Sequence, residues 1–412
     1  MDETVGRTPW SAHPWTRLKT GRAETDKGLH TRMEIDQMLH GELKGGVLTR
    51  EDLPTPALML DMDAFESNIA KMAAYAKEHN RALRPHGKTH KCPEVAKALI
   101  RAGAVGACAA KISEAEAFAQ NGVTGILVTT AVIGKDKIER AVRLASAHPD
   151  TIFSVDNAQN VRDLDAAAGA AKSRLNLVVD LWVGRRTGIQ LGKAALGLAQ
   201  LIDSLPHVKL AGLQAYAGHA SHVIGFEERK KASREAMAPA LETRRLIESC
   251  GIQVPLLTGG STGTYNIDSE IDGITELQPG SFIFMDVDYG RIGGQDGPVY
   301  RDFRNSLSVL TTVVSKPADA VAVVDGGYKA FSTDKPFTPE ARHLPSLTFN
   351  WAGDEHGIVR MAGLALSVEV GDRIEFIIPH CDPSVNLYDR IYCMRGENVE
   401  AVWDIAARGM SQ

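Results

Sequence analysis

The residue with the clearest chemical potential is a lysine in a short basic turn. Lys88 lies in the stretch from Leu83 to Lys91, in which an apolar run ends at a proline and a glycine. Four basic neighbours flank it within this stretch: Arg84, His86, His90 and Lys91. Nearby positive charge lowers the pKa of a lysine toward the neutral amine that forms a Schiff base with a carbonyl. A solvated basic loop is the alternative, because most lysines are exposed.

A second candidate is a run of glycines and hydroxyl residues that follows a predicted strand near Val254. The run consists of Gly259, Gly260, Ser261, Thr262, Gly263 and Thr264. Glycines let backbone N–H groups approach an anion closely, and the three hydroxyls add side-chain donors. A plain turn is the alternative for a run of this composition. Its position relative to Lys88, described below, favours a phosphate site.

A third candidate lies near the carboxyl terminus, in the segment Ile377 to Pro383. Alternate residues of an extended segment share one face, so we expect His380 and Asp382 to point together while Cys381 turns away. One imidazole nitrogen and one carboxylate oxygen make half of a metal site. A surface turn between two prolines is the alternative.

The elements that must position these residues alternate between short apolar runs and helical patterns. The predicted strands begin near Ala82, Val105, Ile126, Ile152, Leu175, Val208, Val254 and Glu276. Eight strands alternating with helices predict an α/β fold, a closed TIM-like (β/α)8 barrel. The first strand of such a barrel neighbours the eighth, and the site lies on the loops after the strands. We therefore expect Lys88, after the first strand, and the glycine run, after the seventh, to hold one cofactor.

After about Tyr300 the residue pattern changes to short β-rich runs separated by turn residues. We predict three regions: an amino-terminal extension of unknown role (1–46), a cofactor-binding barrel (47–300) and a β-rich carboxyl-terminal domain (301–412). The last of these carries the candidate metal pair.

Composition limits the class of partner. A formal charge of −5 gives no broad basic surface, which argues against nucleic acid and favours a small metabolite. The five cysteines form no CxxC pair, which indicates reduced thiols and a cytoplasmic location. No apolar run approaches the ~18 residues of a membrane helix, so we expect no membrane association.

The lysine segment also carries a family resemblance. Together with the following residues 92–96 and 103–106 (Cys-Pro-Glu-Val-Ala and Gly-Ala-Val-Gly), it resembles the D-threonine aldolase and D-serine dehydratase family, and the resemblance extends from about Asp52 to Trp403. These are pyridoxal-phosphate enzymes built like alanine racemase, with a barrel followed by a β domain. The resemblance implies that Lys88 carries pyridoxal 5'-phosphate and that the chain forms a homodimer.

Further site residues are implied by the same resemblance. Residues 276–281 and 284–289 resemble the phosphate side of the family's site, which makes Gln278 and Tyr289 cofactor contacts. Tyr216 resembles the tyrosine beside the cofactor ring. Arg186 matches the family's arginine after the fifth strand, which contacts the cofactor or the substrate carboxylate, but the acidic residue and the cysteine of that pattern are absent here. These departures suggest an altered substrate pocket.

The family places a divalent metal at the position of His380 and Asp382. Dehydratase members tend to have His-x-Cys, whose soft thiolate suits zinc, although zinc also binds carboxylates. The harder carboxylate of Asp382 favours Mn²⁺ or Mg²⁺ over Zn²⁺ and points toward the aldolase branch.

The predicted activity is therefore cleavage of a D-3-hydroxy-α-amino acid, such as a D-threonine-like substrate, to glycine and an aldehyde. We expect a metal-bound hydroxide or a histidine such as His222 to take the proton of the β-hydroxyl. A dehydratase acting on D-serine or D-3-hydroxyaspartate is the main alternative. A non-catalytic, cofactor-binding regulatory protein is a more remote one, and the β domain with its metal pair argues against it.

Overall fold

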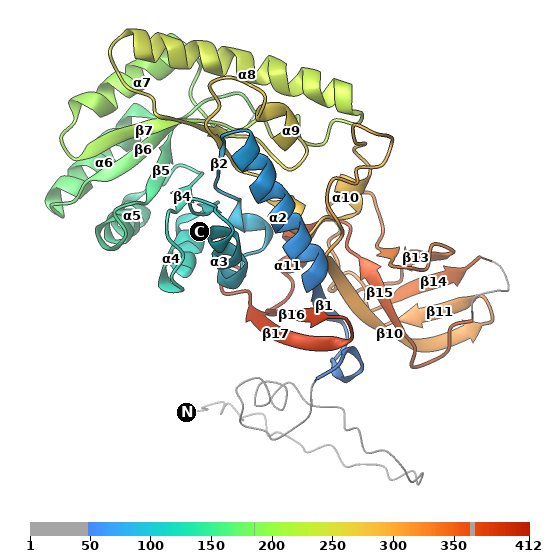
Figure 1. Cartoon of the computed structure of the whole chain (residues 1–412). Coiled ribbons are helices and arrows are strands. Elements are labelled where there is room, and N and C mark those ends of the chain that lie inside the picture. The colour runs from blue at the N-terminus through green and yellow to red at the C-terminus, as the bar shows by residue number, and fades with distance from the viewer. Residues whose placement is uncertain (1–47, 185, 363–366) are drawn as a thin grey trace, which may run out of the picture.

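The computed structural model describes residues 48–184, 186–362 and 367–412 (Figure 1). The predicted amino-terminal extension, residues 1–46, lies outside this part of the chain. The described chain has a barrel of strands and helices and a region rich in strands, and α2 (Met62–Glu78) runs between them (Figure 1).

The barrel contains the eight parallel strands expected from the sequence. They are β2 (Ala82–Leu83), β3 (Cys108–Ala109), β4 (Leu127–Val128), β5 (Ile152–Val155), β6 (Leu175–Asp180), β7 (Val208–Ala215), β8 (Leu256–Gly259) and β9 (Glu276–Leu277). Their order in the sheet is β2-β9-β8-β7-β6-β5-β4-β3, and a parallel bridge between His86 and Cys108 joins the two ends. The predicted (β/α)8 barrel is confirmed, and the first strand neighbours the eighth.

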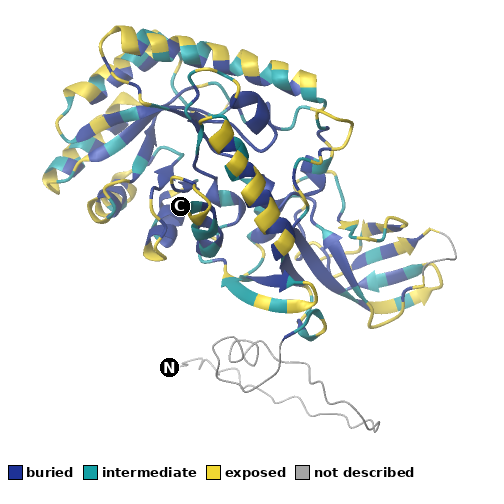
Figure 2. Cartoon of the chain, in the orientation of Figure 1, coloured by how far each residue is buried: buried dark blue, intermediate teal, exposed yellow. Residues whose placement is uncertain are grey.

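Helices surround this sheet. They are α3 (Pro93–Arg101), α4 (Ile112–Gln120), α5 (Lys135–Ala147), α6 (Ala158–Ala170), α7 (Lys193–Ser204), α8 (Phe226–Ser249) and the short α9 (Tyr265–Asp268). Local signals account for several starts: the side chain of Asn157 caps α6, and Pro93 opens α3, where its missing N–H costs nothing. Figure 2 shows buried strands and helices with exposed outer faces, the pattern that a single barrel core requires.

The β-rich region forms a second sheet. Its strands are β10 (Leu307–Ala318), β11 (Val321–Val324), β12 (Glu340–Ala341), β13 (Leu347–Trp351), β14 (Gly357–Met361), β15 (Arg373–Ile377), β16 (Arg390–Arg395) and β17 (Asn398–Asp404). The strand β1 (Ala57–Asp61) joins this sheet, antiparallel to β10 and parallel to β16. A strand from the start of the described chain therefore belongs to the later sheet, while the exact domain boundaries stay a prediction.

Short helical elements complete the described chain. They are η1 (Arg50–Asp52), η2 (Gly87–Thr89), η3 (Ser281–Ile283), α10 (Val287–Gly290) and α11 (Cys381–Val385). The helix α11, which follows β15, contacts η2, which follows the first barrel strand. This contact brings a segment of the β-rich region to the carboxyl-terminal end of the barrel. Among the described helices, none is both long and apolar enough to cross a membrane.

Candidate active site

One cavity at the carboxyl ends of the barrel strands brings together four of the predicted site residues. Lys88, Arg186, Tyr216 and Gln278 all line it, and its volume is about 340 Å³. This size falls in the range of pockets that bury a small ligand. The cavity therefore joins residues that are up to 190 positions apart in sequence, since Lys88 and Gln278 lie on its wall together.

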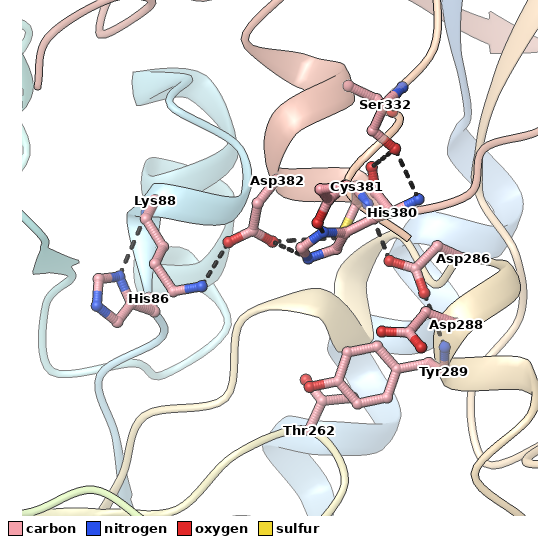
Figure 3. Close-up of polar contacts among 12 residues, drawn as sticks. His86, Lys88, Thr262, Asp286, Asp288, Tyr289, Ser332, His380, Cys381 and Asp382 are labelled. Carbon is pink, nitrogen blue, oxygen red and sulfur yellow. Dashed lines mark hydrogen bonds and ion pairs between the residues drawn. The ribbon is translucent and has the colours of Figure 1, made fainter. Parts of the chain in front are cut away.

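The backbone around Lys88 is held tightly. A side chain at Gly87 would collide with the ring of Phe118, so the turn admits only glycine without rearrangement. The backbone N–H of Lys88 donates to Nδ1 of His86 at 3.3 Å. The amine of Lys88 forms an ion pair with the carboxylate of Asp382 in α11 (Figure 3).

The expected cationic surroundings of Lys88 are corrected by the structure. Arg84 makes a bidentate ion pair with Glu276 at 3.0 Å, so its charge is balanced. Burial lowers the pKa of His86 well below its ordinary value and that of His90 to about 3, so both imidazoles are neutral.

Lys91 is also neutralised, by Glu114 at 3.0 Å. Burial by itself lowers the pKa of Lys88, but the carboxylate of Asp382 outweighs it and raises that pKa above its ordinary value. The prediction that positive neighbours depress the pKa of Lys88 is therefore wrong for this arrangement, because each neighbour is either paired or uncharged.

The predicted metal pair converges, although by a different local structure. Nε2 of His380 and Oδ2 of Asp382 lie 3.8 Å apart. One cation with bonds of about 2.1 Å to each atom can reach both. Nδ1 of His380 lies 2.7 Å from a carboxylate oxygen of Asp334, the type of contact that orients a metal-binding imidazole.

The expectation of a fully extended segment at this pair is not met. His380 is extended, but Cys381 begins α11 and Asp382 lies in its first turn. Cys381 is fully buried, and its backbone N–H donates to Asp286 at 2.9 Å. Pro383 is compatible with the helix because it lies in the first turn, where a backbone N–H has no partner within the helix. Within the described ranges no group of three His, Cys, Asp or Glu side chains converges as a metal site, so the pair offers two ligands.

The glycine run forms a closed loop between β8 and α9. Its hydroxyls mainly hold the loop itself: Oγ1 of Thr264 donates to Asp268 at 2.6 Å and accepts from the N–H of Ser261 at 3.1 Å. Oγ1 of Thr262 accepts from the backbone N–H of Phe282 at 3.0 Å. The prediction that the Thr264 hydroxyl binds an anion is therefore not supported, because its only proton is already donated.

The glycines of this loop allow close approach to the segment after β7. A side chain at Gly259 would collide with the carbonyl of Ala215, and one at Gly263 with the carbonyl of Ser221. Gly260 has a φ of +75°, which disfavours other residues. The hydroxyl of Ser221 is buried and has no hydrogen-bond partner among the described residues, so it is left for a ligand.

His222 lies in a charged cluster beside Tyr289. Its Nδ1 is 3.1 Å from Oδ2 of Asp288, and its ring packs on Tyr289 at a centroid distance of 4.5 Å. The amine of Lys335 contacts the same carboxylate at 2.7 Å. Burial opposes ionisation of Asp288, but its bonds to His222 and Lys335 prevail and hold its pKa at about 2.

The barrel interior beneath the cavity is polar. Nε2 of Gln278 donates to Oγ1 of Thr258 at 2.9 Å, and Nε2 of Gln214 donates to Oδ1 of Asp180 at 2.9 Å. Burial raises the pKa of Asp180. Gln278 is therefore held in place from below and presents to the cavity an amide whose donors are partly engaged.

Arg186 and Tyr216 lie together on the cavity wall. The guanidinium of Arg186 is 5.6 Å from the centroid of the Tyr216 ring, within cation–π range. Arg186 is exposed and Tyr216 is half-buried. The pair is accessible to a ligand that enters the cavity.

Sequence reasoning missed several residues of this site. Ser221, Asp288, Asp334 and Lys335 were not singled out as functional. Asp334 and Lys335 lie on a turn with no motif, and only folding brings them to His380 and Asp288. Ser221 had one available signal, since it directly precedes His222.

Comparison with known proteins agrees with this geometry. Residues 60–288 match the family described as alanine racemase, N-terminal domain, and residues 306–394 match a serine dehydratase domain. The chain is 39% identical to a D-threonine aldolase of Arthrobacter sp, over 89% of this chain and 96% of the relative. It is 37% identical to a 3-hydroxy-D-aspartate aldolase of Paracoccus denitrificans (strain Pd 1222), over 88% and 94%.

More distant relatives include a dehydratase. A D-threo-3-hydroxyaspartate dehydratase of Delftia sp. (strain HT23) is 27% identical over 87% of this chain and 96% of the relative. The crystal structure of D-threonine aldolase from Filomicrobium marinum superposes with a TM-score of 0.84 at 33% identity, covering 90% of this chain and all of that one. The chain therefore belongs to the D-threonine aldolase and D-serine dehydratase family, whose fold is that of alanine racemase.

Proposed function

We propose that this protein is a pyridoxal-phosphate and divalent-metal-dependent aldolase that cleaves D-3-hydroxy-α-amino acids to glycine and an aldehyde. The observation that carries the proposal is the contact between Lys88 and Asp382, which brings a barrel lysine and the metal pair of the β-rich region into one site. Three relatives at 36–39% identity are named as aldolases of such amino acids.

The residues fit the cofactor at both of its ends. The amine of Lys88 opens into the cavity and would hold the cofactor aldehyde. Gly259 to Thr264 offers a loop that side chains do not obstruct. The backbone carbonyl of Ser221 lies against Gly263, and its buried hydroxyl has no partner among the described residues. Tyr216, Gln278 and Tyr289 would flank the bound group. When bound, pyridoxal phosphate supplies an electron sink for the bond that breaks at Cα.

His380 and Asp382 fit a hard divalent cation. Mn²⁺ or Mg²⁺ suits a nitrogen and carboxylate pair completed by water or substrate oxygen, and Asp334 would fix the His380 ring. A cation in this position supplies Lewis acidity toward the β-hydroxyl of the substrate. Chelation of the purified protein, followed by readdition of each metal, identifies the ion.

His222 is the protein group proposed to take the β-hydroxyl proton. Its Nδ1 faces Oδ2 of Asp288 at 3.1 Å, which leaves Nε2 as the nitrogen that would accept a proton. The carboxylate of Asp288 then stabilises the positively charged ring. Arg186, exposed on the cavity wall, would pair with the substrate carboxylate.

The dehydratase alternative uses the same groups differently. There Lys88 would remove the α proton, and a metal held by His380 and Asp382 would supply Lewis acidity for loss of hydroxide; the products would be ammonia and a keto acid. The dehydratase of Delftia keeps this alternative open, but its identity of 27% is lower than that of either aldolase. The carboxylate of Asp382 in place of a thiolate favours the aldolase.

Product analysis tests the proposal. The full chain is incubated with D-threonine, D-3-hydroxyaspartate and D-serine in the presence of cofactor and Mn²⁺. Glycine with an aldehyde supports cleavage, whereas ammonia with a keto acid supports dehydration. The predicted homodimer is tested separately, since a sedimentation mass of one subunit with full activity would reject it.

A further inference from the structure

An arginine behind the glycine loop is fully buried. Arg229 lies in the first turn of α8 and has no solvent exposure. Its guanidinium donates only to backbone carbonyls, namely those of Val223, Gly225, Gly263, Ile292 and Gly293. Arginine is almost never fully buried unless it is paired, so this burial requires an explanation.

The acceptors belong to three separate segments of the proposed site. Nε donates to the carbonyl of Gly263 in the loop after β8 at 2.7 Å. One terminal nitrogen reaches Val223, two residues after Ser221, at 2.9 Å, and also Ile292 at 2.9 Å. The segment that contains Ile292 follows α10, which carries Tyr289. Arg229 therefore joins the backbones of the segments that provide Ser221, the glycine loop and Tyr289.

The next turn of the same helix holds the other end of the loop. Ser233 lies four residues after Arg229 and so projects from the same face of α8. Its hydroxyl donates to Asp268, which in turn accepts from Thr264 at 2.6 Å. Helix α8 thus contacts the glycine loop at Gly263 directly and at Thr264 through Asp268.

The charge of Arg229 is not balanced by a carboxylate. No acidic side chain in the described part of the chain forms an ion pair with it. Its hydrogen-bond acceptors are neutral carbonyls, and the rings of Phe226 and Tyr300 lie 5.7 and 5.8 Å from its guanidinium. Burial lowers the pKa of Arg229, which reflects the cost of keeping a cation there. Arginine nevertheless stays protonated in proteins. An anion on the ligand side of the loop would offset this charge.

We propose that Arg229 is a positioning residue for the cofactor phosphate, one that supplies a fixed positive charge from behind the glycine loop. The inference rests on the proposed cofactor, because it assigns the charge to the phosphate of pyridoxal phosphate. It predicts that Arg229 acts on the phosphate and has little effect on the rest of the cofactor.

The test compares two aldehydes that differ only in the phosphate. Dissociation constants of pyridoxal phosphate and of pyridoxal are measured on the full-length apoprotein by visible absorbance, for the wild type, Arg229→Gln and Arg229→Lys. Arg234→Gln is the matched control, since Arg234 is exposed on the same helix and pairs with Glu270. The informative quantity is the ratio of the two dissociation constants. A general loss of folding, or damage to the aldehyde site, weakens the binding of both aldehydes and leaves this ratio unchanged.

We expect Arg229→Gln to reduce the preference for the phosphorylated aldehyde about tenfold through the loss of one charge interaction. Arg229→Lys keeps the charge and should stay within about threefold of the wild-type ratio, as should Arg234→Gln. A wild-type ratio in Arg229→Gln, or an equal loss in the Gln and Lys variants, would overturn the role of the charge. A folded wild-type chain that binds neither aldehyde would instead overturn the proposed function.

A second measurement decides the question if Arg229→Gln fails to fold. The phosphorus NMR signal of the cofactor bound to the wild type is followed across pH. A positive potential at the loop keeps the phosphate a dianion, so its shift should be constant down to about pH 5.5, below the second pKa of about 6 for a free phosphate monoester. A bound phosphate that titrates as the free one does would contradict the inference.

Discussion

Lys88 and Asp382 form an ion pair across the boundary between the barrel and the β-rich sheet. The two residues are 294 positions apart, and the pair exists because α11 contacts η2. Burial by itself raises the pKa of Asp382, but Lys88 and His380 outweigh it and hold that pKa below its ordinary value. The carboxylate is therefore charged and stands between the proposed cofactor lysine and the proposed metal.

Lys88→Ala should abolish covalent attachment of the cofactor while the chain stays folded. The Lys88 side chain is partly exposed at the cavity, so we expect the chain to fold, with some loss of stability because the Asp382 carboxylate loses its ion pair. Borohydride reduction of the wild type followed by peptide mass spectrometry should place the adduct on Lys88. Lys111→Ala is the control, because Lys111 lines the same cavity. An adduct on another lysine would disprove the assignment.

Removal of the metal should stop cleavage while cofactor remains on Lys88. We expect turnover to fall by about 100-fold or more, because the Lewis acid at the β-hydroxyl is lost. Asp382→Ala should match the chelated wild type, and Asp382→Cys should shift the metal preference toward zinc because thiolate is softer. Metal content and turnover are measured on the same samples.

Cys381→Ala is the neighbouring control for the metal prediction. The Cys381 side chain is buried. Its backbone N–H donates to Asp286, a contact that alanine retains, and alanine loses the weak contact of the thiol with Oδ2 of Asp382 at 3.5 Å. We expect a loss of stability of about 1 kcal/mol from the small cavity and nearly full activity. Activity that survives Asp382→Ala but not Cys381→Ala would reject the ligand pair.

His222→Asn should lower turnover about 100-fold, in keeping with the loss of a general base. Asp288→Asn should have a smaller effect of the same sign, since it leaves the ring but weakens the contact that holds Nδ1. His356→Asn is the control, because His356 is exposed in the turn before β14. Steady-state kinetics across pH measure all three, and unchanged turnover in His222→Asn would show that another group takes the proton.

Asp268 should make stability depend on pH in a defined window. Burial raises its pKa from 3.8 to about 6, so the folded chain keeps a proton that the unfolded chain has released between these values. The contribution of Asp268 to the free energy of unfolding therefore falls by about 3 kcal/mol as the pH rises from about 4 to 6. Denaturant unfolding at each pH gives the free energy of unfolding of the wild type and of Asp268→Asn. Plotted against pH, the two free energies should converge or cross within this window. A constant difference between them would contradict the buried, raised carboxyl.

Much of the fold could be predicted because its signals are local. Each barrel strand is a short apolar run followed by a turn, which is the pattern that predicted all eight strands. The place of β1 could not be predicted this way, because its partners β10 and β16 lie about 250 and 330 residues further along. The apolar run of β1 indicates a strand but not its sheet.

Prediction of the site was also limited by contacts between residues that are distant in sequence. Lys88, His380 and Asp382 were predicted from residue type, spacing and the family resemblance together, and the structure brings all three together. The electrostatic surroundings of Lys88 were mispredicted because Glu276 neutralises Arg84 from a distant strand. Asp334, Lys335 and Arg229 were missed because their roles arise from contacts across the fold, and no local pattern marks a buried arginine on a helix.

The most direct test of the central claim follows the hydrogen on the α carbon. D-Threonine carrying deuterium at Cα is converted by the wild-type protein with cofactor and Mn²⁺, and the early products are analysed by mass spectrometry. Cleavage of the Cα–Cβ bond leaves the α deuterium in place, so we predict glycine that retains it, together with acetaldehyde, and no primary isotope effect on kcat/KM. A keto acid and ammonia formed with loss of the deuterium and a primary isotope effect would contradict the aldolase assignment.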